Sequence, residues 1–458
     1  MARRSPVAGS PRLRQAGRRR FLQAAGAGVA ALQWPAQAQT ASVGRALLVG
    51  NTAYRPSDEN LPPAQKSVHD LEQRLQRLGF DTLALSDPPL GQVHAELERL
   101  QAAVDANPAL AAVFYFCGHG FQSNAENFLV PAGGDLQSAP AHLSKTCMSL
   151  ERDVFSRLKR RDGPAATVIM VDACRTPDRP RTPGEGYNQT LPPDGCHVVF
   201  ATGPGKRAFA PNDATRHTLF AEVLVSELDL TDPARSILLT LETVRVKVAK
   251  RVNSIPTIVR TFGPNAQEPE VASNVRGDPK WVPSRAPAAA PLPGTPANEL
   301  EAARQAASPQ DAAARLQKLL PTLPAGDEAD LAQQRLKDLE TVLRAARSAR
   351  LPLDGMAQFA AAQPPQVAED VQRALRGDKY AALRVAETLP LPAAGELIER
   401  SDHGRWMIFA ANLGNGIAAY RLSLHFRNVD RRDAEASRYL NLARANNYTP
   451  PRQLDSKR

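Results

Sequence analysis

The chain has 458 residues, 43% hydrophobic and 23% charged, so it is long and apolar enough for roughly two to three folded domains. Its formal net charge is +10, but residues 1–38 hold seven arginines and no acidic residue, and without those seven the remainder carries only +3. No run of Lys and Arg interleaved with aromatic residues remains, which argues against a nucleic-acid partner, and no segment has the pattern of a stable membrane span.

The first 38 residues have the pattern of an export signal. Residues 18–22 (RRRFL) resemble the twin-arginine pattern, residues 21–32 form an apolar stretch of small residues, and residues 36–38 (AQA) fit a cleavage site. The alternative is a disordered basic tail. A twin-arginine signal predicts a bacterial protein that folds before it crosses the membrane and is then periplasmic or secreted.

From residue 45 to residue 262 the sequence alternates strand-like and helix-like stretches. The expected strands are 45–51, 80–85, 111–116, a hairpin-like segment at 127–134, 167–171, 197–202 and 256–262. The expected helices are 63–78, 90–104, 150–158, 218–228 and 237–252. This alternation predicts an α/β domain with a doubly wound, mostly parallel sheet and helices on both faces.

Two short strings in this domain suggest its chemistry. FYFCGHG places His119 after the apolar run 111–116, and VIMVDACR places Cys174 after the run 167–171. Both runs predict buried parallel strands, and reactive groups collect beyond the carboxyl ends of such strands. We therefore expect His119 and Cys174, 55 residues apart, to meet at one edge of the sheet, where an imidazole can accept a thiol proton. The alternatives are a core histidine and a buried, unreactive cysteine.

The second half of the chain has a different organisation. Residues 263–298 contain eight prolines and predict an extended linker, while residues 299–350 predict a helical hairpin or a semi-rigid helical spacer. Residues 370–450 predict a helical-repeat module, because GDKYAALRVA (377–386) aligns with GNGIAAYRLS (414–423) at a spacing of 37. Chance similarity of two Ala-rich helices is the alternative. The unit resembles the Sel-like branch of the tetratricopeptide repeats, which usually bind other proteins.

The four cysteines are too few for a disulfide scaffold and match no zinc-binding spacing, so we expect no metal and no cofactor. Two pairings remain open after export. One is a bridge between Cys147 and Cys196. The other is a regulatory bridge between Cys117 and Cys174, for which two buried thiols are an equal explanation.

Seven short strings occur in one order across residues 43–262: ALLVGNTAY, LQRLGF, FYFCGHGFQ, NFLVPAGG, VDACRTP, VVFATGPG and HTLFAEVL. Together they resemble the bacterial caspase-like and metacaspase-like cysteine proteases, in which a His-Gly precedes the Ala-Cys-Arg string by about 50 residues. The resemblance implies a six-stranded, mostly parallel sheet carrying a Cys–His dyad. It makes Cys174 the nucleophile and His119 its general base, with the backbone N–H groups of Gly120 and Cys174 holding the oxyanion.

The resemblance also bears on specificity. Asp172 stands two residues before the nucleophile, where a buried carboxylate favours Arg or Lys in the substrate, although it could instead only order the loop. Metacaspases carry a second acid at the start of the first helix, and this chain has Lys66-Ser67-Val68 there. The Pro- and Arg-rich loop after Cys174 suggests self-cleavage after Arg175 or Arg181, with a flexible basic loop as the alternative.

The sequence thus predicts an exported cysteine endopeptidase that cleaves proteins or peptides after basic residues, with repeats that recruit a protein partner. A second hypothesis is a catalytically silent caspase-like scaffold that acts as a protein-binding module. A serine or metal hydrolase has no support, because the sequence has neither a G-x-S-x-G nor an H-E-x-x-H string.

Overall fold

The computed structural model describes residues 42–123, 125–138, 142, 145–160, 163–174, 188–204, 206–282 and 296–450. The expected export signal at residues 1–38 lies outside them, as do the candidate self-cleavage positions Arg175 and Arg181. Within the described residues, none of the helices combines the length and apolar character that crossing a bilayer requires.

Within the described residues, eight strands form the sheet. They are β1 (Gly44–Gly50), β2 (Phe80–Ser86), β3 (Ala111–Ser123), β4 (Glu126–Leu129), β5 (Met148–Ser149), β6 (Thr167–Cys174), β7 (Cys196–Phe200) and β8 (Glu270–Ser273). Six of them follow the order β2-β1-β3-β6-β7-β8, and β4 and β5 extend the sheet from β3. The pairs from β2 to β7 are parallel, whereas β8, β4 and β5 pair antiparallel to their neighbours. The mostly parallel α/β fold is confirmed, with eight strands rather than six because β3 runs on past residue 116.

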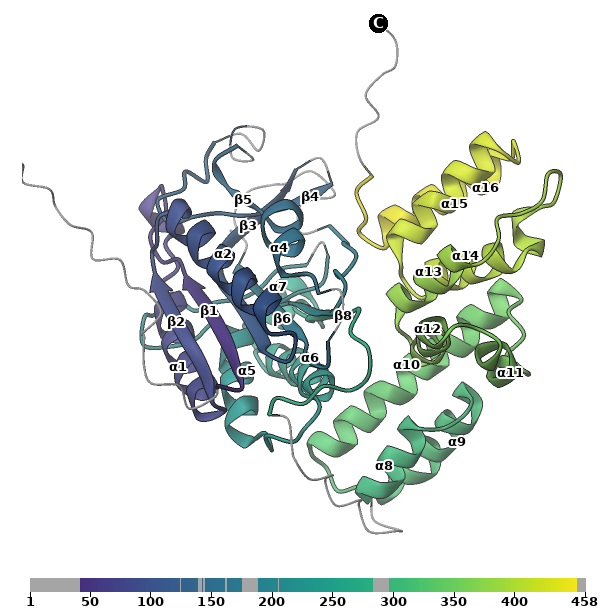
Figure 1. The fold of residues 1–458 in the computed structure, drawn as a ribbon, viewed down its shortest axis with the longest axis horizontal. Coiled ribbons are helices and arrows are strands. Elements are labelled where there is room, and N and C mark those ends of the chain that lie inside the picture. Colours follow the sequence, from purple (N-terminus) through teal and green to yellow (C-terminus); the bar gives the residue numbers. More distant parts are fainter. Residues whose placement is uncertain are drawn as a thin grey trace, which may run out of the picture. The chain divides into compact units, whose positions relative to one another are not determined.

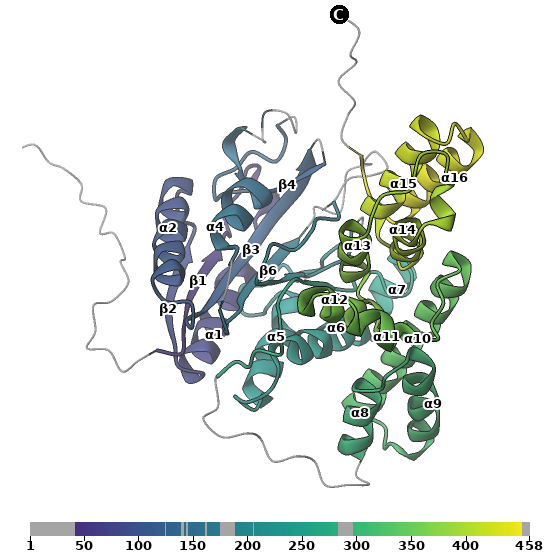
Figure 2. The same cartoon turned by 45° about the vertical axis from the view of Figure 1, so that its right-hand side comes forward.

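Helices cover both faces of this sheet (Figure 1). Their bounds are α1 (Pro63–Arg77), α2 (Leu90–Ala106), α4 (Ser156–Leu158), α5 (Leu219–Leu230), α6 (Ile237–Asn253) and α7 (Pro256–Phe262), and a π-helical segment at Leu150–Phe155 leads into α4. The strands lie between α2 on one side and α5 and α6 on the other (Figure 2). Leu48, Val113 and Met170 share a core with α1, α5 and α6, and the alternate residues Leu47 and Phe114 are buried on the α2 side.

Residues 256–262 were expected as the last strand, and this prediction is wrong. The segment is α7, in which Pro256 occupies the first turn and none of the residues is buried. A proline fits the first turn of a helix because its missing N–H would be unpaired there anyway. The sheet is completed instead by β8, which lies in the segment expected to be linker. Farther along that segment, Trp281 is fully buried and donates to Thr240 Oγ1 at 3.1 Å, so residues 270–282 are packed structure.

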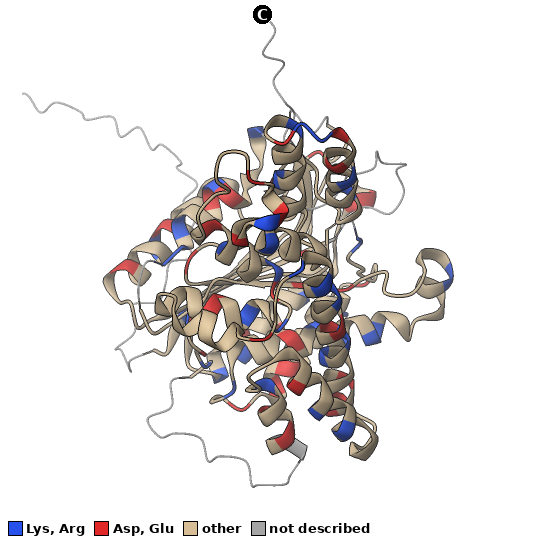
Figure 3. Cartoon of the chain, turned by 90° about the vertical axis from the view of Figure 1, so that its right-hand side faces the viewer, with Lys and Arg blue, Asp and Glu red and all other residues tan. Residues whose placement is uncertain are grey.

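The C-terminal part is helical, as expected. Its helices are α8 (Pro296–Arg304), α9 (Pro309–Leu319), α10 (Asp327–Ala349), α11 (Met356–Ala361), α12 (Pro365–Ala374), α13 (Lys379–Thr388), α14 (Asp402–Asn412), α15 (Gly416–Asn428) and α16 (Asp433–Ala445). The first three share a small apolar core, so the expected spacer is a packed set of helices. The remaining helices bury a second core rich in alanine. Lys and Arg alternate with Asp and Glu along these helices (Figure 3).

The two aligned strings of the expected repeat begin equivalent helices, α13 and α15. Asp378 accepts hydrogen bonds from the first turn of α13, and Asn415 does the same for α15. Gly377 and Gly414, which precede these caps, have φ values of +103° and +97°, a conformation that favours glycine. The local likeness is therefore present, while membership of a named repeat family stays a prediction.

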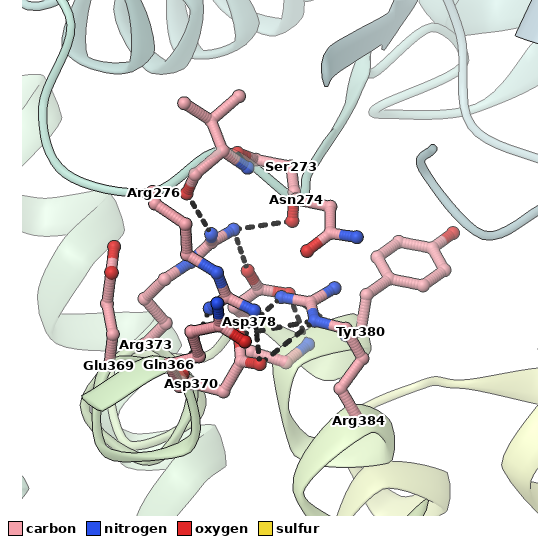
Figure 4. A network of polar contacts seen from close by, with 12 residues as sticks. Ser273, Asn274, Arg276, Gln366, Glu369, Asp370, Arg373, Asp378, Tyr380 and Arg384 are labelled. Carbon is pink, nitrogen blue, oxygen red and sulfur yellow. Dashed lines mark hydrogen bonds and ion pairs between the residues drawn. The ribbon is translucent and has the colours of Figure 1, made fainter. Parts of the chain in front are cut away.

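A network of ion pairs and hydrogen bonds joins β8 and the residues after it to α12 and α13 (Figure 4). Arg373 donates to the carbonyl oxygens of Ser273 and Val275 at 2.5 and 2.8 Å and pairs with Asp378 at 2.6 Å. Arg276 pairs with Asp370 at 3.0 Å. The helical part is thus tied to the edge strand of the sheet, and we call this set of contacts the β8 junction.

Candidate functional site

Strands β3 and β6 are adjacent and parallel, and their register pairs His119 with Cys174. The pairing is continuous from Ala112 and Thr167 to these last residues of the ladder. Parallel register places residues of both strands at the same level of the sheet. The backbone positions of the expected base and nucleophile are therefore direct neighbours at the carboxyl edge, while their catalytic roles stay a prediction.

A hydrogen bond to the backbone sets the tautomer of the neutral His119 ring. Its side chain is buried, with 6% of the residue exposed, and its Nε2 lies 2.7 Å from the carbonyl oxygen of Glu59. Because a carbonyl oxygen can only accept a hydrogen bond, Nε2 must carry the proton in this contact. The neutral ring then has its lone pair on Nδ1. This arrangement can hold a ring in a fixed orientation with one nitrogen ready to accept a proton.

Tyr54 supports the same histidine from a second side. Its hydroxyl accepts a hydrogen bond from the His119 backbone N–H at 3.0 Å, and its ring meets the imidazole edge-on at a centroid distance of 4.5 Å. Burial raises the pKa of the Tyr54 hydroxyl well above 10, so it stays protonated. A Cβ at Gly118 would lie 2.5 Å from the Tyr54 hydroxyl, so glycine is required for this close approach.

The loop that carries Tyr54 and Glu59 is shaped by side chains that accept from its backbone. Asp87 accepts from the N–H groups of Thr52 and Ala53, at 2.6 and 3.1 Å, and Asn60 accepts from that of Tyr54 at 2.8 Å. Such bonds from side chains to the backbone fix the course of this segment, which includes the 3-10 turn Ser57–Glu59. The contacts of Tyr54 and of the Glu59 carbonyl with His119 were not predicted from the sequence. The string ALLVGNTAY, which ends on Tyr54, was the one signal that pointed to this loop.

Asp172 is fully buried, and its two carboxylate oxygens differ. Oδ2 accepts from the Tyr115 hydroxyl at 2.8 Å, from Cys117 Sγ at 3.9 Å and from the Thr218 hydroxyl. Burial raises the pKa of Asp172 to about 6, although these three hydrogen bonds oppose the shift. Oδ1 is also buried and has no hydrogen-bond partner among the described residues. One oxygen thus orders the structure, and the other retains the capacity to bind a donor.

At the start of α1, where metacaspases carry a second acid, this chain has Lys66-Ser67-Val68, and an acid, Asp70, lies one turn later. Asp70 Oδ2 lies 2.8 Å from Lys66 Nζ and 2.8 Å from His217 Nε2. Burial alone would raise the pKa of Asp70, but hydrogen bonds from Lys66 and His217 outweigh it and lower that pKa. Ser67 accepts from the N–H of Thr218, which in turn contacts Asp172. Asp70 was not predicted from the sequence, although positions 66 and 70 are one helical turn apart and so share one helix face.

The other expected site features lie at the same edge or are buried elsewhere. Gly120 follows His119 in β3 and pairs with Leu129 of β4, and its role as an oxyanion donor with Cys174 stays a prediction. Cys147 and Cys196 are free and buried, so the bridge between them is not formed, and burial raises the pKa of each thiol to about 12. Among the described residues, no three His, Cys, Asp or Glu side chains are grouped as metal ligands.

A family model described as the caspase domain matches residues 43–277, just over half of the chain. A crystal structure of caspase-1 from Spodoptera frugiperda is similar at 16% sequence identity with a TM-score of 0.37, covering 54% of this chain and 92% of its own. No curated protein matches the sequence.

Proposed function

Because this chain belongs to the caspase-domain family, we propose that it is a cysteine endopeptidase whose dyad is Cys174 and His119. The observation that supports this most directly is the register of β3 and β6, which pairs these two residues at the carboxyl edge of the sheet. The hydrogen bond of His119 Nε2 to Glu59 adds to it, because it leaves Nδ1 as the basic atom of the neutral ring.

In the proposed reaction, Nδ1 of His119 accepts the thiol proton of Cys174, and the thiolate attacks the carbonyl carbon of the scissile peptide. The carbonyl oxygen becomes an oxyanion held by the backbone N–H groups of Gly120 and Cys174. The imidazolium then gives its proton to the leaving amine as the C–N bond breaks, which leaves an acyl-enzyme. Water hydrolyses that thioester and restores the thiol.

We propose that Asp172 gives the enzyme a preference for cleavage after Arg or Lys. Its free Oδ1 supports this, because a buried carboxylate oxygen without a donor is a favourable partner for a basic side chain. Asp70 does not supply a second free acid there, since Lys66 and His217 already contact it. The proposed preference therefore depends on one oxygen of one residue.

Two further parts of the proposal concern location and partners. The pattern of residues 1–38 supports export of a bacterial protein to the periplasm or beyond. The helices after residue 370 support binding of a protein partner, as helical repeats commonly do. Protein or peptide substrates follow from the family.

The test is labelling with a thiol-reactive peptide ketone that carries Arg at the cleavage position. We expect covalent labelling of the full chain that is lost in both Cys174→Ala and His119→Ala. Cys196→Ala is the matched control and should label normally, because Cys196 is a buried thiol on the neighbouring strand. An unlabelled wild-type chain would instead favour the silent scaffold, for which the replacement of the first-helix acid by Lys66-Ser67-Val68 is the specific argument.

A further inference from the structure

The chain that follows Cys174 is described again from Asn188, and there it contacts the helical part. Asn188 Nδ2 donates to the carbonyl oxygen of Thr449 at 3.0 Å, and Thr449 N donates back to Asn188 Oδ1 at 3.0 Å. This reciprocal pair joins residues that are 261 positions apart in the sequence. Asn188 is almost fully buried, so losing its partners would leave polar atoms unpaired.

Gln189 extends this contact to the ends of three helices. Its Nε2 donates to the carbonyl oxygens of Gly414, just after α14, and of Asn446, just after α16, at 2.8 and 3.0 Å. Its Oε1 accepts from the N–H of Gly416, the first residue of α15, at 2.7 Å. Gln189 is 5% exposed and all of its side-chain hydrogen-bonding atoms are used. The contacts of this one side chain therefore depend on the relative positions of α14, α15 and α16.

Asn188 is also bound on the side of the proposed site. Asn188 N donates to Asn127 Oδ1 at 2.6 Å, and Asn127 Nδ2 donates to the Asn188 carbonyl oxygen at 3.2 Å. Asn127 lies in β4 and is itself held by the Glu151 carboxylate at 2.8 and 3.0 Å. Strand β4 pairs with the end of β3 beyond His119. A continuous set of hydrogen bonds thus runs from the helical part through Asn188 to the strand beside the proposed site.

We propose that Asn188 and Gln189 are positioning residues through which the helical part holds Asn127 of β4, next to the end of β3 that carries His119, and that the reaction depends on this hold. The inference rests on the proposed peptidase function. It gives the helical part a role in catalysis besides any recruitment of a partner. Because Gln189 bonds to the ends of three helices, a shift of any one of them is transmitted through the adjacent Asn188 to Asn127 of β4.

The experiment compares Gln189→Ala and Asn188→Ala with Tyr380→Phe in the full chain. Tyr380→Phe removes a hydrogen bond to Glu270 at the β8 junction, and so it perturbs the same two parts of the protein at a different place. With an Arg peptide substrate, we expect kcat to fall by about tenfold or more in both test variants, with KM changed less than about threefold. Tyr380→Phe should keep kcat within about twofold.

A second readout does not require peptidase activity. The rate of Cys174 alkylation by iodoacetamide, followed by mass spectrometry against pH, reports the fraction of thiolate, and we expect its profile to shift in Gln189→Ala but not in Tyr380→Phe. Equal losses of kcat in all three variants, or an unchanged alkylation profile in a folded Gln189→Ala chain, would overturn the positioning role. A wild-type chain that alkylates normally but cleaves nothing would instead contradict the peptidase proposal.

Discussion

Replacing Asp172 by Asn should have opposite effects on stability and on activity. The carboxyl is fully buried and its pKa is raised from 3.8 to about 6, chiefly by burial. When folding raises the pKa of an acid, the folded protein becomes less stable as pH rises, because the unfolded chain releases that proton at a lower pH. The loss begins near pH 3.8 and is complete above pH 6.

The shift of about two pH units corresponds to about 3 kcal/mol of unfolding free energy at neutral pH. Asn resembles the protonated carboxyl, so Asp172→Asn should match the wild type near pH 4 and exceed it by up to about 3 kcal/mol above pH 6. Denaturant titrations at several pH values measure this difference. A difference that does not change with pH would refute the reasoning about Asp172.

The same variant should lose activity toward basic substrates, because the amide cannot form an ion pair with them. We expect kcat/KM for an Arg peptide to fall by about a hundredfold, equal to about 2.7 kcal/mol of lost charge-assisted binding. Since Oδ2 already accepts three hydrogen bonds, only Oδ1 is available, and a bidentate contact to Arg is not. Lys and Arg peptides should therefore be cleaved within about tenfold of each other by the wild type. A large preference for Arg, or full activity in Asp172→Asn, would show that another group binds the substrate.

Three other substitutions test the site and the fold. Gly118→Ala forces a Cβ to within 2.5 Å of the Tyr54 hydroxyl, so we expect a loss of about 1–3 kcal/mol in denaturant titration together with reduced peptide cleavage. Tyr54→Phe removes the acceptor for the His119 N–H and should cost about 1 kcal/mol while lowering kcat more than it changes KM. Trp281→Ala should cost about 3–5 kcal/mol, because the indole is fully buried, and an unaffected unfolding free energy would restore the view of residues 263–298 as a free linker.

The central strands could be predicted from sequence because their signals are local. The runs 111–116 and 167–171 are continuous apolar stretches, as strands buried on both faces require, and the structure extends them to β3 and β6. Residues 256–262 were expected to form a strand because Thr, Ile, Val and Phe favour strands where their side chains are packed. In α7 none of them is buried, so there is no packing for that preference to reflect.

The neighbours of the two expected catalytic residues could not be predicted in the same way. Tyr54 and Glu59 reach His119 from a loop whose course depends on the acceptors Asp87 and Asn60, and no periodicity encodes such contacts. Thr218 contacts Asp172 across 46 residues of sequence, and this pairing depends on how α5 packs on the sheet. Sequence reasoning identifies residue types that can react, whereas the bonds that set their ionisation depend on tertiary structure.

The proline-rich composition of residues 263–298 suggested two parts joined by a tether, and the contacts around β8 argue for a different relation. Among the strands that the structure describes, β8 pairs with β7 alone, so its outer edge would expose unpaired backbone groups. Arg373 of α12 donates to the carbonyl oxygens of Ser273 and Val275, and thereby satisfies acceptors along that edge. Together with the contacts of Asn188 and Gln189, these bonds join the helical part to the α/β domain at two places. A change in the helices would therefore alter contacts both at the outer edge of β8 and around Asn188, which is bonded to Asn127 of β4.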